Sequence, residues 1–308
     1  MKSIPKITII IPCKNAEDTI QKTFDSVRKQ NYHNLECIVM DGNSSDKTME
    51  VVNRNSDILS LIISEEDASG AAACNKAIQL SSGDIIGFLY ADDYLAEDSL
   101  DVIASAVINN PNVDVYSYGL SIEDLKTKKI IFESYSKRDI TLKIDNILYK
   151  HVLNHFYTKK IFNKYGLLQP LYYDGTIFYA NDREFLIRLA LNNVKNYVIE
   201  KVLYKMTFHK DSYTGSRKNL IKIREEHIGI AEHYINEHDF SQYKKNKLVA
   251  FKAHNLSLLL VYYFYKTDIK NIKKIFLEGF HTKGFLWFFD IIKCPISEII
   301  YRARLKKW

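Results

Sequence analysis

The sequence of 308 residues predicts an α/β fold in which a mainly parallel central sheet is flanked by helices. Its first hundred residues alternate β-type apolar runs with stretches whose apolar residues recur at helical spacing, as in parallel strands joined by helices. A hydrophobic content of 46% is enough for one large or two modest cores. Beyond Asn219 the spacing of Leu220, Ile223 and His227 predicts helices that continue toward the tail.

The elements of the first half follow from the apolar pattern in order. A β-branched run at residues 7–11 suits a fully buried central strand. Ile20, Phe24 and Val27 recur at helical spacing after a helix start at Asp18. The alternation then continues with predicted strands at residues 35–40, 59–64 and 84–90 and predicted helices at residues 44–53 and 70–80.

Basic charge is concentrated toward the C-terminal end. The net charge is +6, but residues 244–308 contain 14 Lys or Arg against 4 Asp or Glu, so the preceding part is acidic. Lysines such as Lys266 and Lys283 are interleaved with aromatics such as Tyr262 and Phe285, a mixture expected of helices at a lipid interface. The alternative is that the aromatics pack on the main domain and the lysines form a solvated face. No nucleic-acid-binding motif accompanies this charge, so nucleic acid is not an expected partner.

Several other classes of protein are disfavoured. The apolar run before Pro12 is too short for a signal peptide, and no uncharged stretch reaches the roughly 20 residues that cross a bilayer, so the expected location is cytoplasmic. Four cysteines without paired spacing favour reduced thiols over a zinc site or disulfides. No GxGxxG follows the first strand and no P-loop motif occurs, which removes the main support for dinucleotide or P-loop binding.

Polar or acidic segments follow the predicted strands, where ligands bind in α/β sheets, at residues 12–15, 41–46, 65–70 and 91–93. Asp41 could accept hydrogen bonds from a base or a ribose, although by itself it is more simply a turn aspartate before Gly42. Asp92 and Asp93 are adjacent at the end of an apolar strand, so their mutual repulsion predicts a compensating divalent cation. The alternative is two solvated loop aspartates that cap the next helix.

The order and spacing of four motifs carry a family resemblance. IIPCKN at residues 10–15, VMDGNSSD at 39–46, SSGD at 81–84 and ADD at 91–93 together resemble the family 2 glycosyltransferases of bacterial surface polysaccharide synthesis. The resemblance covers roughly residues 5–210 and implies a GT-A fold, sugar transfer with inversion, and Mn²⁺ or Mg²⁺ as cofactor. It also implies a UDP-sugar donor and a glycan or undecaprenyl-diphosphate-linked acceptor, in O-antigen or capsule synthesis. With such an acceptor, the basic tail would hold the protein peripherally at the inner face of the cell membrane.

The same resemblance implies roles for individual residues. Asp41 would contact the nucleotide base, Asp92 the ribose and Asp93 the metal ion. The remaining residues expected at the donor are Pro12, Asn15, Glu17, Asp67, Lys76 and His209. Cys74 stands where many members have an arginine, so Lys76 would supply the positive charge there, and the diphosphate contacts of that helix stay open.

Asp182 matches the acidic residue that family members place at the start of a helix well after the metal motif, and it is the expected base. Glu184 is the second choice. The alternative is that Asp182 is simply an acidic residue of the first helical turn, where the helix dipole stabilises negative charge. In that case Glu184 would be solvated and Arg188 would pair with one of the two carboxylates.

The resemblance implies a GT-A domain at residues 1–215, with a nucleotide-sugar-binding half at 1–119 and an acceptor-side half at 120–215. A helical, basic and aromatic region at 216–308 follows. Two other functions stay open: a noncatalytic nucleotide-sugar-binding scaffold and a nucleotidyltransferase. The second is disfavoured because no glycine-rich phosphate loop follows residues 7–11.

Overall fold

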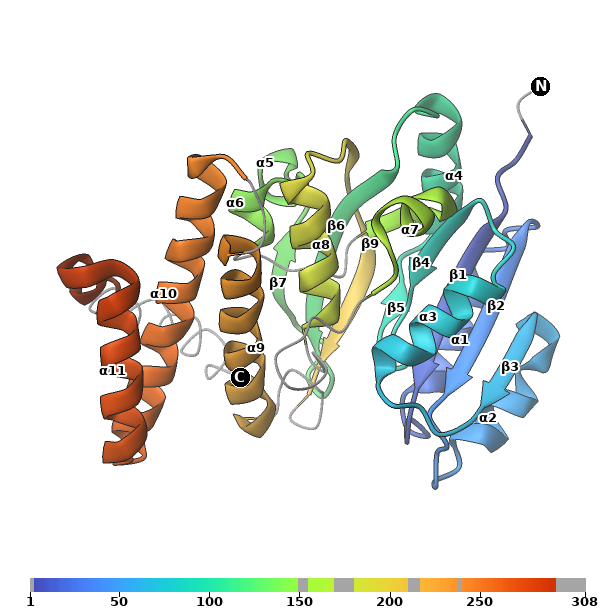
Figure 1. Cartoon of the computed structure of the whole chain (residues 1–308). Coiled ribbons are helices and arrows are strands. Elements are labelled where there is room, and N and C mark those ends of the chain that lie inside the picture. Colours follow the sequence, from blue (N-terminus) through green and yellow to red (C-terminus); the bar gives the residue numbers. More distant parts are fainter. Residues whose placement is uncertain (1–2, 149–154, 169–179, 210–216, 237–239, 292–308) are drawn as a thin grey trace. The chain divides into compact units, whose positions relative to one another are not determined.

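The computed structural model describes residues 3–148, 155–168, 180–209, 217–236 and 240–291 (Figure 1). The chain divides into two compact units. Unit 1 comprises Met1–Pro170 and Asn181–His209, and unit 2 comprises Leu171–Ala180 and Lys210–Trp308. Each unit is described separately below.

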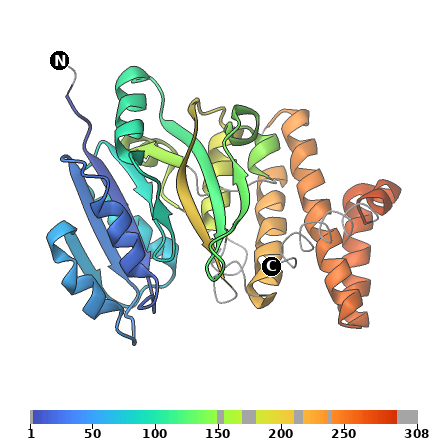
Figure 2. The ribbon, with the colours of Figure 1, turned by 180° about the vertical axis from the view of Figure 1, so that it is seen from behind.

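The first half of unit 1 contains four parallel strands in the spatial order β3-β2-β1-β4. The strands are β1 (Ile7–Cys13), β2 (Leu35–Asp41), β3 (Leu61–Ser64) and β4 (Ile85–Phe88). Helices α1 (Ile20–Arg28) and α2 (Thr48–Arg54) cover one face and α3 (Gly70–Leu80) covers the other (Figures 1 and 2). The short 3-10 helix η1 (Ser56–Ile58) leads into β3.

The predicted strand at residues 7–11 is confirmed as central and fully buried. Ile7, Ile9 and Ile11 pack in one apolar cluster with Phe24 and Val27 of α1, because alternate side chains of a strand point to the same face. Helix α3 has the predicted bounds, and the Ser69 hydroxyl caps it by accepting a hydrogen bond from the Ala72 amide at 3.2 Å.

Two predicted helix starts lie too early. The helix expected from residue 44 begins at Thr48, since Asp46 accepts hydrogen bonds from both the amide and the hydroxyl of Thr48, an arrangement of a turn before a helix. Likewise α1 begins at Ile20, after a turn that holds Asp18.

The second half of unit 1 makes the complete sheet mixed. Strand β8 (His155–Thr158) lies antiparallel between β4 and β6 (Val115–Asp124), and β9 (Asn196–Phe208) runs parallel to β6. Strands β5 (Tyr94–Leu95) and β7 (Ile130–Ser134) pair antiparallel with β9 and β6, respectively. Parallel pairing therefore joins the four strands of the first half and β6 with β9, whereas β5, β7 and β8 pair antiparallel. The antiparallel pairing of β7 has a local cause. Asp124 Oδ1 accepts hydrogen bonds from the amides of Lys126 and Thr127 in the tight turn that returns the chain as β7.

The other helices of unit 1 are α4 (Ser99–Asn109), α5 (Lys137–Ile140), α6 (Ile144–Ile147), α7 (Lys159–Tyr165) and α8 (Asn181–Leu191). Three cysteines, Cys13, Cys37 and Cys74, are buried free thiols, which fits the reduced state expected from sequence; Cys294 lies outside the described residues.

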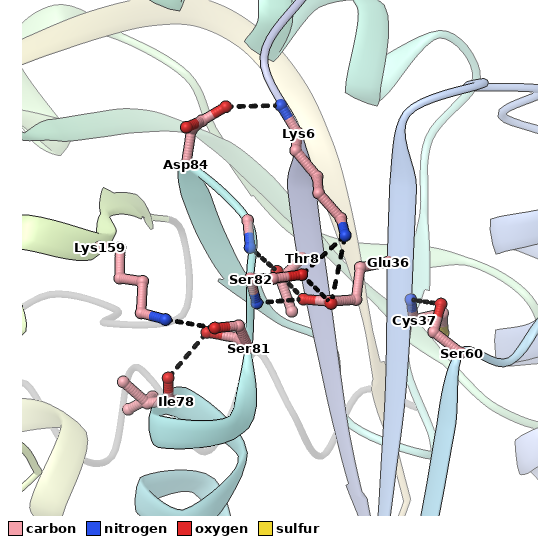
Figure 3. Close-up of polar contacts among 11 residues, drawn as sticks. Lys6, Thr8, Glu36, Cys37, Ser60, Ile78, Ser81, Ser82, Asp84 and Lys159 are labelled. Carbon is pink, nitrogen blue, oxygen red and sulfur yellow. Dashed lines mark hydrogen bonds and ion pairs between the residues drawn. The ribbon is translucent and has the colours of Figure 1, made fainter.

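A buried carboxylate ties β1, β2 and β4 together at the ends where these strands begin (Figure 3). Glu36 of β2 accepts hydrogen bonds from the Thr8 hydroxyl at 2.6 Å and the Ser82 amide at 2.8 Å, and Lys6 lies 3.4 Å away. Burial raises the pKa of Glu36, but the hydrogen bonds from Ser82 and Thr8 outweigh burial and lower it to about 2. The SSGD motif thus belongs to the scaffold and lies at the opposite strand ends from the acidic loops.

Unit 2 is helical, with α9 (Arg217–Asn236), α10 (Gln242–Tyr265), α11 (Ile269–Lys283) and the short η2 (Gly284–Leu286). Its apolar core contains Trp287, whose indole nitrogen donates to the Ser257 hydroxyl at 2.8 Å. Trp287 therefore packs inside unit 2 itself, whereas the sequence interpretations placed the tail aromatics at a lipid interface or on the main domain.

Other tail aromatics are exposed. Tyr265, Phe285 and Phe289 retain 81%, 77% and 60% of their surface, so these three side chains are accessible on unit 2. None of the helices in the described ranges combines the length and apolar character that a membrane crossing requires.

Candidate functional site

The loops that follow β1 and β2 are joined by hydrogen bonds, as expected for neighbouring parallel strands. The Asn15 side chain accepts from the Ser45 amide at 2.9 Å, and Glu17 accepts from the Lys47 amide at 2.8 Å. Asn15 has a left-handed backbone with φ of 50°, a conformation that asparagine tolerates better than most residues. Pro12 lies half-buried at the end of β1, so the three residues expected at the nucleotide pocket share one edge of the sheet.

Asp41 is buried among hydrogen-bond donors of the protein itself. Its Oδ2 accepts from the Ser44 amide at 3.1 Å and the Ser64 hydroxyl at 2.6 Å. Its Oδ1 accepts from the Ser44 hydroxyl and, at 3.8 Å, from the Cys13 thiol. A carboxylate has about four acceptor positions, and these donors occupy all of them. Asp41 therefore links the ends of β1, β2 and β3 by hydrogen bonds. For Asp41 to contact a nucleotide base, one of these donors would have to move away.

The two adjacent aspartates after β4 have different environments. Asp93 is 3% exposed, and its carboxylate accepts from the Tyr204 hydroxyl at 2.6 Å and the Thr207 amide at 2.7 Å. Burial, with the nearby charge of Asp92, raises the pKa of Asp93, and the hydrogen bonds from Tyr204 and Thr207 oppose that rise. Asp93 thus joins the loop after β4 to β9.

Asp92 faces outward beside His209, at the end of β9. Its side chain is 30% exposed, and its Oδ2 lies 3.2 Å from Nε2 of His209, whose side chain is 20% exposed. The structure thus joins two residues that the sequence separates by 117 positions. The sequence-based expectation gave the metal to Asp93 and the ribose to Asp92; Asp92 is the more exposed of the two carboxylates, and it is the one that lies beside His209.

A divalent cation fits this pair only together with a substrate. The described residues contain no group of three or more His, Cys, Asp or Glu side chains that could hold a metal ion. Mg²⁺, however, is usually held by one or two carboxylates together with substrate phosphates, and carboxylates suit Mn²⁺ equally. Asp92 and His209 would hold such an ion, with the remaining ligands supplied by a diphosphate.

Asp67 and Lys76 lie near the start of α3 and on its surface. Oδ2 of Asp67 is buried and accepts no hydrogen bond from any residue in the described ranges. Burial raises the pKa of Asp67, and so does the charge of Glu65. Lys76 forms an ion pair with Glu65, so its charge is already partly compensated. Of the two residues, Asp67 has the acceptor atom that still lacks a donor.

The first turn of α8 distinguishes Asp182 from Glu184. Glu184 is 1% exposed and forms a two-pronged pair with Arg188, at 2.8 Å from Nη2 and 3.1 Å from Nε. Asp182 instead retains partial exposure and accepts from the Arg183 amide at 2.7 Å. Burial raises the pKa of Asp182, and the charge of Arg183 opposes the rise. Arg188 therefore engages the carboxylate of Glu184, while that of Asp182 lies at the partly exposed start of the helix.

Comparison with known families identifies the chain. The model of "Glycosyl transferase family 2" matches residues 8–166, which is more than half of the sequence. The chain belongs to glycosyl transferase family 2.

Two bacterial glucosyltransferases are among the relatives of this family 2 chain. It is 36% identical over 136 residues to the UDP-Glc:alpha-D-GlcNAc-diphosphoundecaprenol beta-1,3-glucosyltransferase WfgD of Escherichia coli, covering 44% of this chain and 53% of that protein. It is 24% identical over 280 residues to the GalNAc(5)-diNAcBac-PP-undecaprenol beta-1,3-glucosyltransferase of Campylobacter jejuni, covering 89% of this chain and 86% of that protein. The chain spans about half or less of the length of several curated relatives, WfgD among them.

Solved structures of low identity share the fold. S. aureus TarS 1-349 in complex with UDP aligns with a TM-score of 0.68 at 20% identity, over 97% of this chain and 87% of that one. Mannosyltransferase PcManGT from Pyrobaculum calidifontis, in complex with GDP-Man and Mn2+, aligns with a TM-score of 0.62 at 19% identity, over 99% and 83% of the two chains. These likenesses confirm the predicted GT-A type of fold.

Sequence reasoning missed several residues of this family 2 site. Tyr204 binds Asp93 and also accepts from the Tyr90 amide at 3.3 Å, so it supports the loop between β4 and the paired aspartates. Thr207, whose amide donates to Asp93, was missed as well. No local signal distinguishes Tyr204 from the other tyrosines of the sequence, since its position depends on the register between β9 and its neighbours.

Proposed function

We propose that this chain transfers a sugar from a UDP-sugar to a glycan or undecaprenyl-diphosphate-linked acceptor, with inversion, in the synthesis of O-antigen or capsule. One observation carries the proposal: in a family 2 chain, outward-facing Asp92 meets His209 at 3.2 Å beyond the end of the central β4 strand. The names of the E. coli and C. jejuni relatives, both of which include an undecaprenol-linked acceptor, support the acceptor class.

On the donor side, Asp92 and His209 would hold Mn²⁺ or Mg²⁺ against the diphosphate. The bound ion would stabilise the negative charge that develops on the departing diphosphate. Asp67 offers its unfilled acceptor, Oδ2, to a hydroxyl or N–H of the donor, and Pro12, Asn15, Glu17 and Asp41 form the adjoining edge. Lys76 would reach the diphosphate only by leaving Glu65. Asp93 is a positioning residue, since Tyr204 and Thr207 hold it behind Asp92.

On the acceptor side, Asp182 would take the proton of the attacking hydroxyl. The acceptor oxygen forms its bond to the anomeric carbon as the bond from that carbon to the diphosphate breaks. A single displacement of this kind inverts the configuration at the anomeric carbon. Burial raises the pKa of Asp182, which makes its ionised carboxylate a stronger base than an exposed aspartate.

We also propose a cytoplasmic location with peripheral membrane contact through unit 2. Exposed Phe285 and Phe289 lie close in sequence to Lys283, which suits an interface with anionic lipid headgroups. Sedimentation with vesicles of phosphatidylglycerol and phosphatidylcholine tests this contact. Substitution of both phenylalanines by serine should release the protein, and equal binding by the doubly substituted protein would count against the contact.

Calorimetric titration of UDP with and without Mn²⁺ tests the donor site. Wild-type protein should bind UDP more tightly with Mn²⁺, and both Asp92→Asn and His209→Ala should remove that gain. Asp101→Asn, at an exposed position of α4, is the matched control and should behave as wild type. Binding of UDP that ignores both Mn²⁺ and Asp92 would refute the metal-assisted donor site.

A further inference from the structure

A small cavity in unit 1 brings Asp182 together with a buried histidine, His155 of β8. The cavity has a volume of about 30 Å³, and its other walls include Tyr90, Tyr157 and Leu168. A cavity needs about 10–15 Å³ to hold one water molecule, so this one accepts a substituent of two or three atoms rather than a whole sugar ring.

The hydrogen bonds of His155 indicate which of its ring nitrogens carries the proton. The Asn196 side-chain amide donates to the Ser117 hydroxyl oxygen at 2.8 Å, and that hydroxyl lies 2.8 Å from Nδ1 of His155. With the Ser117 oxygen accepting from Asn196, Nδ1 is the acceptor that the described residues offer its hydroxyl hydrogen, and we assign the hydrogen bond in that direction. The ring proton of a neutral imidazole is then on Nε2.

The Nε2 atom itself is buried and has no hydrogen-bond partner within the described part of the chain. His155 is 3% exposed, and burial lowers its pKa to about 3, so the ring is neutral at physiological pH. A neutral imidazole in this tautomer cannot accept the proton of a substrate at Nε2, and it offers one N–H donor. A buried donor without a partner carries a cost that a bound oxygen atom would remove.

The walls of the cavity are held in place from several elements. Asn75 of α3 binds Leu168 twice, by donating to its carbonyl at 2.6 Å and accepting from its amide at 2.9 Å. Tyr157 packs edge-on against Phe185 of α8, with ring centroids 5.5 Å apart. A mainly apolar wall that also contains His155, Asp182 and two tyrosines suits a sugar substituent, which combines C–H surface with an oxygen atom.

We propose that the Nε2–H of His155 donates a hydrogen bond to a hydroxyl or carbonyl oxygen of the acceptor sugar, on a ring carbon next to the reacting hydroxyl. This inference rests on the proposed function, because it takes Asp182 as the base. The reacting hydroxyl must lie within hydrogen-bond reach of Asp182. A substituent that enters the cavity shared by Asp182 and His155 therefore belongs to the same sugar. His155 is then a specificity-determining residue of the acceptor site.

Steady-state kinetics with modified acceptors test the assignment. The donors are UDP-glucose and UDP-GlcNAc, and the acceptors are octyl glycosides of GlcNAc, GalNAc, glucose and galactose with their monodeoxy analogues. For one deoxy position, wild-type protein should lose about 10- to 100-fold in kcat/KM. His155→Leu should show a similar loss with the parent acceptor and no further loss with that analogue, as a double-mutant cycle requires for a direct contact. His155→Gln, which can place an amide N–H near the same point, should recover part of the rate.

The outcomes separate this inference from the proposed function. Unchanged affinity of His155→Leu for UDP shows that the variant is folded and that its donor site is intact. An active wild-type protein whose acceptor preference His155→Leu leaves unaltered overturns the assignment of His155 alone. A change confined to the KM of the donor also overturns it, since the cavity would then hold the donor sugar. Wild-type protein that neither binds UDP nor transfers to any glycoside overturns the proposed function and this inference together.

Discussion

Glu36→Gln should destabilise unit 1 in a pH-dependent way. The carboxylate of Glu36 is surrounded by donors from Thr8, Ser82 and Lys6, which lower its pKa from 4.5 to about 2 (Figure 3). A depressed pKa in the folded state means that the ionised group stabilises the fold above pH 4.5. That stabilisation is lost as the pH falls from 4.5 toward 2. The difference between the two pKa values corresponds to about 3 kcal/mol at pH 7.

Urea denaturation followed by far-ultraviolet circular dichroism measures this effect. Tryptophan fluorescence is unsuitable, because Trp287 and Trp308 both belong to unit 2. At pH 7 the substitution should cost about 3 kcal/mol, and by pH 3 the difference from wild type should shrink to roughly half. Glu50→Gln, at an exposed position of α2, should change stability by less than about 0.5 kcal/mol. An equal cost of Glu36→Gln at pH 7 and pH 3 would refute the ionised role of this carboxylate.

Three further substitutions test the scaffold and the site. Gly83→Ala should lower the free energy of unfolding by about 1–3 kcal/mol, because a Cβ there would meet the Thr8 amide nitrogen at 2.8 Å. Thermal or urea unfolding measures the loss. Gly229→Ala is the control: its Cβ would meet nothing within 4 Å, so it should be neutral or stabilising. Tyr204→Phe should lower the free energy of unfolding by about 1–3 kcal/mol, since Asp93 loses a buried hydrogen-bond donor. It should also weaken Mn²⁺-dependent binding of UDP. Unaltered stability would contradict the role of Tyr204 in supporting Asp93. Asp182→Asn should lower kcat at least about 100-fold while the affinity for UDP is retained. The wild-type rate should fall as the pH drops through the raised pKa of Asp182. A variant as active as wild type would exclude Asp182 as the base.

Several features of the fold could be predicted from the sequence because their causes are local. Five apolar or β-branched residues in succession require a strand that is buried on both faces, and residues 7–11 form one. Helix α3 has its predicted bounds, and its start has a local cause, since the Ser69 hydroxyl accepts from the Ala72 amide. The order of the acidic motifs also sufficed for the family resemblance, which the match over residues 8–166 confirms.

The pairing of the strands that follow β4 could not be predicted from the sequence in this way. The antiparallel entry of β8 between β4 and β6 depends on contacts between segments about 40 to 70 residues apart. No local pattern within residues 120–180 encodes that register, so the mixed character of the complete sheet emerged only from the structure.

By itself, the sequence determined the parallel half of the sheet, the helical C-terminal region and the acidic positions at the strand ends. Tertiary structure alone distinguished neighbouring carboxylates that are chemically identical in the sequence. Asp93 is buried under Tyr204 while Asp92 faces His209, and Glu184 is paired with Arg188 while Asp182 is not. The physical reason is that the environment of a carboxylate depends on burial and on donors from distant segments, and these are fixed only when the strands and helices pack.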